Sequence, residues 1–109
     1  MDGEFVSLVG EAKGLNSKVF SLVRLELLSG LSALGREGAT FRELKAILGG
    51  SDGGLLANLK ALEAMGYVKR ATVTLESRKL ESFQVTEQGV EQWEHVRAWL
   101  HKFVARGGD

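Results

Sequence analysis

The side chains best suited to chemistry in this 109-residue sequence are hydrogen-bonding and basic groups concentrated between residues 40 and 80. Asn58 carries a carboxamide, which donates and accepts at once and so matches the N6 and N7 atoms of adenine. Arg78 and Lys79 form an adjacent basic pair, and such groups bind phosphates without reading sequence. These residues predict contact with double-stranded DNA. The other candidate DNA-binding residues are Thr40, Arg42, Ser51, Gly53, Gly54, Ala57, Lys60 and Arg70.

Three small residues beside Asn58 indicate how a double helix could come close. Gly53, Gly54 and Ala57 offer little steric hindrance, and the Ala57 methyl group suits contact with a thymine methyl. The alternative interpretation is a face of small residues that packs against a neighbouring element of the same chain.

Residues for catalysis or metal binding do not stand out. His95 and His101 are six residues apart, so a helix places them on different faces, and the chain has no cysteine. The glycine-rich stretch 49–54 lacks the Gly-Lys-Ser/Thr ending of a phosphate-binding loop. No Ser/His/Asp arrangement is evident. The sequence therefore predicts neither an enzyme nor a metal or cofactor site.

Composition indicates a soluble globular domain, with 44% hydrophobic and 26% charged residues. The formal net charge is zero, which counts against a strongly basic nucleic-acid binder. Residues 51–80 nevertheless carry five basic and three acidic side chains, a small local excess. The acidic start lacks the features of a secretory signal, and no apolar run is long enough for a bilayer. We therefore expect a cytoplasmic protein without a membrane partner.

Thr40 and Glu43 have the spacing of a capping box, in which each side chain accepts a hydrogen bond from the other's backbone N–H. They predict a helix over 40–48. Its start could also hold a phosphate near Thr40 and Arg42, because N–H groups at a helix N-terminus attract anions. Capping alone explains Thr40 equally well. The predicted buried residues of this helix are Leu44, Ile47 and Leu48.

A second helix is predicted over 51–65, after a double-glycine turn. Ser51 is its expected N-cap, with phosphate binding as a second role, and Gly66 ends it. Asn58 and Lys60 lie on the outward face. Leucines spaced at i, i+4 and i+7 should form the buried stripe, namely Leu55, Leu59 and Leu62.

A β-hairpin is predicted to follow this helix. Residues 67–75 are rich in β-branched side chains, and residues 81–85 alternate between polar and apolar. The intervening turn, residues 76–80, would carry Arg78 and Lys79 at its tip. There they could enter a minor groove or pair with phosphates, although exposed charges in a turn are often simply solvated.

Helical periodicity also marks both ends of the chain. Residues 1–16 predict a short helix, Ser17 opens a longer one that ends near Gly38, and Thr86 caps the last. Their apolar surface exceeds what one small domain can cover, and large apolar patches usually mark association. The alternative is that both terminal helices fold back on the monomer's own core. The expected dimer-interface residues are Phe5, Leu8, Val9, Val90, Trp93, Val96, Leu100 and Phe103.

Taken together, these segments resemble the winged helix-turn-helix transcriptional regulators, nearest to the small MarR/ArsR-like prokaryotic members. The most specific stretch is residues 59–68, followed at the expected distance by residues 85–89. The earlier matching elements are residues 41–44 and 51–55.

The resemblance implies a mainly α fold with a small antiparallel β-hairpin and terminal dimerisation helices. The chain would form a single domain over 1–109, with an N-terminal helical extension at 1–16, a winged-helix core at 17–86 and a C-terminal dimerisation helix at 87–105. It further implies a homodimer that binds a palindromic or pseudo-palindromic operator.

Two other functions stay open on the sequence alone. A winged-helix protein–protein module with weak or no DNA binding fits the neutral net charge. A switch that responds to a small-molecule effector would place its pocket beside Trp93, at the dimer interface.

Overall fold

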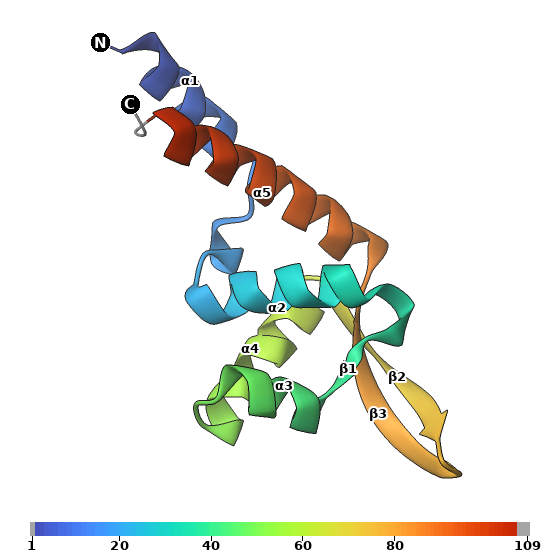
Figure 1. Ribbon diagram of the computed structural model, residues 1–109. Helices are drawn as coiled ribbons and strands as arrows, with labels where there is room; N and C mark the ends of the chain where they lie inside the picture. The colour runs from blue at the N-terminus through green and yellow to red at the C-terminus, as the bar shows by residue number, and fades with distance from the viewer. Residues whose placement is uncertain (1, 107–109) are drawn as a thin grey trace.

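Residues 2–106 are described by a computed structural model. Within them, the elements in chain order are α1 (Gly3–Ala12), η1 (Ser17–Val19), α2 (Leu22–Leu34), η2 (Gly35–Glu37), β1 (Ala39–Thr40), α3 (Phe41–Leu48), α4 (Asp52–Ala64), β2 (Val68–Leu75), β3 (Arg78–Val85) and α5 (Glu87–Arg106). Helices α2, α3 and α4 pack beside the sheet, while α1 and the far end of α5 extend away together (Figure 1). The molecule is correspondingly elongated, measuring 60 × 27 × 24 Å.

The core is built mainly from leucines of α2 and α4. Leu59 and Leu62 are fully buried and Leu55 is 4% exposed, so the predicted leucine stripe of α4 is confirmed. Phe83 of β3 and Val96 of α5 join the same cluster. Burial of this stripe fixes the rotation of α4 and thereby determines which of its residues face outward.

The predicted capping box at the start of α3 is confirmed. The Glu43 backbone N–H donates to the Thr40 hydroxyl at 3.2 Å, and the Thr40 backbone N–H donates to the Glu43 carboxylate at 3.0 Å. These hydrogen bonds favour the ionised carboxylate and lower the pKa of Glu43. The expected burial of Ile47 is wrong, because its side chain is 77% exposed.

Ile47 is exposed because α3 buries a different stripe from the one expected. Phe41 and Leu48 are packed against the core and Leu44 is buried within it. At about 100° per residue, Ile47 is turned away from Leu48 and toward solvent.

The long second helix begins later than predicted. Ser17 opens only the 3₁₀ turn η1, where the Asn16 side chain accepts from the backbone N–H of Lys18. Ser21 is the N-cap of α2, because its hydroxyl accepts from the backbone N–H of Arg24 at 3.2 Å. The break places Val19 inside the core with no exposed surface.

The sheet has the order β1-β3-β2, and both pairings are antiparallel. The short strand β1 was not expected from the sequence; it places Ala39 opposite Phe83. Strands β2 and β3 form the wing, a hairpin that projects from the body (Figure 1).

The wing turn is shorter than predicted and carries neither basic residue. It consists of Glu76 and Ser77, whose φ angles are 51° and 65°. Two-residue turns with positive φ match the right-handed twist of the paired strands, which therefore continue to the tip. Arg78 and Lys79 begin β3 instead, and Arg78 lies opposite Leu75.

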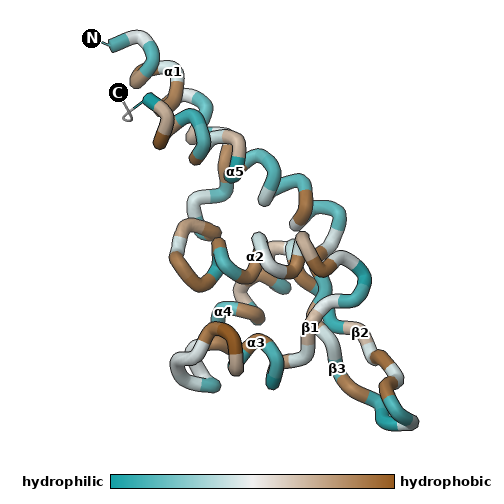
Figure 2. Tube along the Cα trace, in the orientation of Figure 1, coloured by the Kyte–Doolittle hydropathy of each residue, from teal (hydrophilic) through white to brown (hydrophobic). Residues whose placement is uncertain are grey.

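The two terminal helices form an arm, defined here as α1 together with residues 95–106 of α5. The Trp99 indole N–H donates to the Leu8 carbonyl at 2.9 Å, and the Lys102 amine lies 3.3 Å from the Glu11 carboxylate. Apolar residues recur along both helices of the arm (Figure 2). Within residues 2–106, no helix combines the length and apolarity needed to cross a bilayer.

Candidate nucleic-acid interface

The outward face of α4 is the exposed surface opposite the buried leucines. Ser51 caps the helix as predicted, accepting from the Gly54 backbone N–H at 3.0 Å. The preceding turn is held by an ion pair of 2.8 Å between Lys45 and Asp52. No other part of the described chain covers this face. Its exposed residues are Gly53, Gly54, Ala57 and Lys60, and Asn58 at its edge is partly buried.

Asn58 does not project freely from α4. Its Nδ2 group donates to the Gly54 carbonyl at 3.0 Å, and its Oδ1 atom accepts from Arg24 Nε at 2.9 Å. Each contact uses one donor or one acceptor of a side chain that has two of each. One N–H and one lone-pair site therefore remain, and their use by a base stays a prediction.

The wing supplies two basic side chains next to its turn. Arg78 and Lys79 are exposed, and neither takes part in an ion pair among the described residues. The wing and α4 approach each other at a hollow of about 330 Å³, lined on the α4 side by Gly53 and Leu56 and on the β3 side by Glu81 and Phe83. The outward face of α4 and the wing thus belong to neighbouring parts of the molecule.

Arg70 differs from the other predicted DNA contacts because its charge is already paired. Its guanidinium binds the Glu63 carboxylate at 2.8 Å and the Glu81 carboxylate at 3.2 Å. It also lies over the Phe83 ring, 5.2 Å from the centroid. Hydrogen bonding to Glu63 raises the pKa of Arg70. A phosphate would have to displace two carboxylates, so we do not retain Arg70 as a DNA contact.

Thr40 and Arg42 stand at the start of α3. The Thr40 side chain is engaged in the capping box, whereas Arg42 is exposed and forms no ion pair within residues 2–106. Arg42 is therefore the better placed of the two for a phosphate.

A family comparison agrees with this geometry. A model described as a winged helix DNA-binding domain matches residues 23–104. The chain belongs to this family. The predicted resemblance to winged-helix regulators, and the mainly helical fold with a hairpin wing, are thereby confirmed. No match was found among curated proteins.

Solved structures share the winged-helix fold at low sequence identity. A transcriptional regulator homologue from Pyrococcus horikoshii OT3 aligns with a TM-score of 0.76 and 21% identity, over 97% of this chain and 98% of that one. MepR of S. aureus, bound to ethidium bromide, aligns with a TM-score of 0.68 and 16% identity, over 94% and 73%. FabT of Streptococcus pneumoniae, in complex with DNA, aligns with a TM-score of 0.54 and 21% identity, over 94% and 71%.

The arm of this winged-helix chain carries exposed apolar side chains, though not all of those predicted. Leu8 is 5% exposed and Val96 is completely buried, so both are already covered within one chain and cannot face a partner. Trp93 and Leu100 are packed against the core and only partly exposed. The predicted residues that stay exposed are Phe5, Val9 and Phe103 on the arm and Val90 nearer the start of α5. The sequence reasoning missed Val6 and Val104 on the arm and Leu22 on α2.

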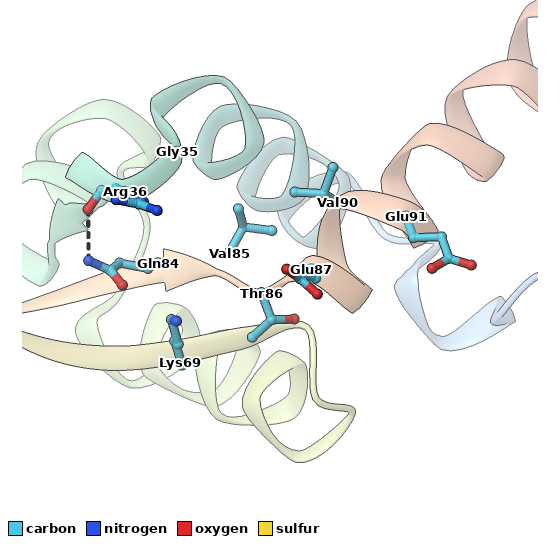
Figure 3. Close-up of a pocket in the computed structure, with 9 residues that line it drawn as sticks. All are labelled: Gly35, Arg36, Lys69, Gln84, Val85, Thr86, Glu87, Val90 and Glu91. Carbon is cyan, nitrogen blue, oxygen red and sulfur yellow. Dashed lines mark hydrogen bonds between the residues drawn. The ribbon is translucent and has the colours of Figure 1, made fainter.

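A hollow of about 440 Å³ lies at the root of the wing, between η2, the wing strands and the first turns of α5 (Figure 3). Val85 and Val90 are among its lining residues, and the Gln84 side chain donates to the Arg36 carbonyl at its edge. Trp93, which was expected to mark an effector pocket, does not line it. Binding of an effector stays a prediction.

The residue that sequence reasoning missed altogether is Arg24. It lies 34 positions before Asn58, and its contact with that side chain depends on how α2 crosses α4. No local motif signals such a pair. In the part of the chain that the structure describes, no group of three or more His, Cys, Asp or Glu side chains could hold a metal ion.

Proposed function

We propose that this winged-helix chain is a cytoplasmic transcriptional regulator that binds double-stranded DNA in a sequence-directed manner as a homodimer. The observation that carries the proposal is the uncovered outward face of α4 beside a wing whose Arg78 and Lys79 make no ion pair among the described residues. The major groove of B-DNA is wide enough to admit an α-helix such as α4. The basic residues of the wing would bind the flanking phosphates. The reported complex of FabT with DNA supports the assignment by analogy of fold.

The roles within the surface follow from its chemistry. Asn58 would read adenine, and Gly53, Gly54 and Ala57 would allow close approach. Lys60, Arg78 and Lys79 would supply the electrostatic attraction to the backbone. Arg42 and the Ser51 cap would hold phosphates at the starts of α3 and α4.

Dimerisation is proposed from the exposed apolar side chains of the arm. An isolated arm would leave Val6 and Val104 in water, with 55% and 68% of their surfaces exposed. Pairing two arms would cover such side chains. Two-fold symmetry would also present two α4 helices to half-sites about one DNA turn apart, which implies a palindromic or pseudo-palindromic operator.

A protein–protein module is the second candidate function. It is favoured by the zero net charge of the chain and by the internal pairing of Arg70. Such a module would use the same fold without reading DNA.

Selection of bound duplexes from a random pool, at a stated salt concentration, separates the two functions. If the protein is a sequence-directed dimeric regulator, we expect enrichment of a palindromic or pseudo-palindromic consensus that contains adenine in each half-site. A pool that remains random after repeated rounds would contradict sequence-directed binding and favour the module. A single asymmetric half-site would contradict the dimer alone.

A further inference from the structure

Arg24 makes two contacts that join parts of the molecule far apart in sequence. Its Nε group donates to Asn58 Oδ1 at 2.9 Å, and its Nη1 group donates to the Lys18 carbonyl at 2.7 Å. Lys18 lies in the segment that connects α1 to α2, whereas Asn58 lies on the edge of the outward face of α4. One guanidinium therefore connects the linker from the arm to the candidate base-reading side chain.

The contacts determine which way round the Asn58 carboxamide lies. Its oxygen faces a donor on Arg24, and its nitrogen faces an acceptor, the Gly54 carbonyl, at 3.0 Å. Rotation of the amide by 180° would set two donors against each other on one side and two acceptors on the other. Both hydrogen bonds would be lost, which makes the observed orientation strongly preferred.

A fixed carboxamide has a consequence for base recognition. The remaining donor and acceptor of Asn58 keep a set order in space, and adenine presents its N7 acceptor and N6 donor in a set order in the major groove. An unrestrained asparagine must lose rotamer freedom when it binds, whereas a side chain already held in place loses less.

The geometry points to Arg24 as a specificity-determining positioning residue: we propose that it fixes the Asn58 carboxamide for adenine recognition without itself contacting the base. The inference rests on the proposed function. It adds a residue of α2, held by the linker after α1, to the residues that would determine base recognition.

A second pair of contacts ties the same linker to the far end of α4. The Asn16 side-chain amide donates to the Tyr67 hydroxyl at 3.1 Å and approaches the Met65 sulfur at 3.5 Å. Asn16 and Lys18 thus hold the linker against both the middle and the C-terminal end of α4. This arrangement keeps the Lys18 carbonyl where Arg24 can use it.

The test compares Arg24→Met, which keeps the length of the side chain but removes its donors, with the parent protein. The readout is the ratio of affinities for the selected duplex and for one in which the half-site adenine is replaced. We expect this ratio to fall roughly two- to twelvefold, the range expected for ordering one polar side chain on binding. Binding to non-specific duplex should change much less than the ratio does.

Three controls make the outcome decisive. Arg36→Ala removes the same charge from η2, the turn that follows the far end of α2, and should leave the ratio unchanged. Asn58→Ala should reduce the ratio strongly, and Arg24→Met added to Asn58→Ala should reduce it no further. Arg24→Lys keeps the charge but lacks the planar guanidinium that bridges two acceptors, so its affinity ratio should fall as that of Arg24→Met does. If thermal unfolding shows that Arg24→Met does not fold, Arg24→Lys is used in its place.

Two failures are distinguishable. A parent protein that selects a consensus, with the same adenine preference retained in both Arg24→Met and Arg24→Lys, would overturn the role of Arg24 alone. A parent protein that selects no consensus would overturn the proposed function and this inference with it.

Discussion

At the scale of single residues, the composition of the outward face depends on the rotation of α4, which is set by its buried leucines. Leu59 is completely buried in the core, whereas Ile47 on the neighbouring helix is 77% exposed. Leu59→Ala should therefore lower the free energy of unfolding by about 2–5 kcal/mol, the usual cost of truncating a buried leucine. Ile47→Ala, the matched control on an exposed apolar side chain, should change it by only about 0.5 kcal/mol. Chemical denaturation measures both, and equal losses would mean that one of these helices is rotated from the orientation described.

At the scale of elements, we predict that the protein dimerises by pairing of two arms. The Trp99 indole stacks on Phe103 of the same helix with 5.1 Å between ring centroids, and its N–H donates to the Leu8 carbonyl of α1. Val6→Glu combined with Val104→Glu places charges where a second arm would pack, and should convert a dimer to monomers in sedimentation equilibrium. Glu4→Gln with Glu91→Gln is the control that alters charge on α1 and α5 without touching those valines. A parent protein that is already monomeric at micromolar concentration, or a double variant that still dimerises, would argue against pairing through the arm.

Elements also show what local sequence can and cannot predict. The capping box of Thr40 and Glu43 could be recognised because its partners are three residues apart and interact within one helical turn. The leucine stripe of α4 followed from helical periodicity for the same reason. Strand β1 could not be found in this way, since two residues have no periodicity and its pairing with β3 depends on the tertiary fold. The contact of Arg24 with Asn58, across 34 residues, is of the same long-range kind.

At the scale of the whole molecule, a chain with zero net charge must bind a polyanion through local charge. The wing concentrates two unpaired cations beside its turn, while Arg70 on the same hairpin is neutralised by Glu63 and Glu81. The charges available to a phosphate are therefore fewer than the sequence suggests. They are also placed at the projecting end of the molecule, where a duplex lying on α4 would meet them (Figure 1).

The most direct test of this account is the salt dependence of duplex binding by Arg78→Ala combined with Lys79→Ala. Loss of two phosphate contacts should weaken binding and make the slope of log affinity against log salt shallower by about two. Lys13→Ala combined with Arg97→Ala removes the same charge from the linker and α5, and should leave the slope near that of the parent. A wing variant with the parent's affinity and slope would contradict the central claim that α4 and the wing together form the DNA-binding surface.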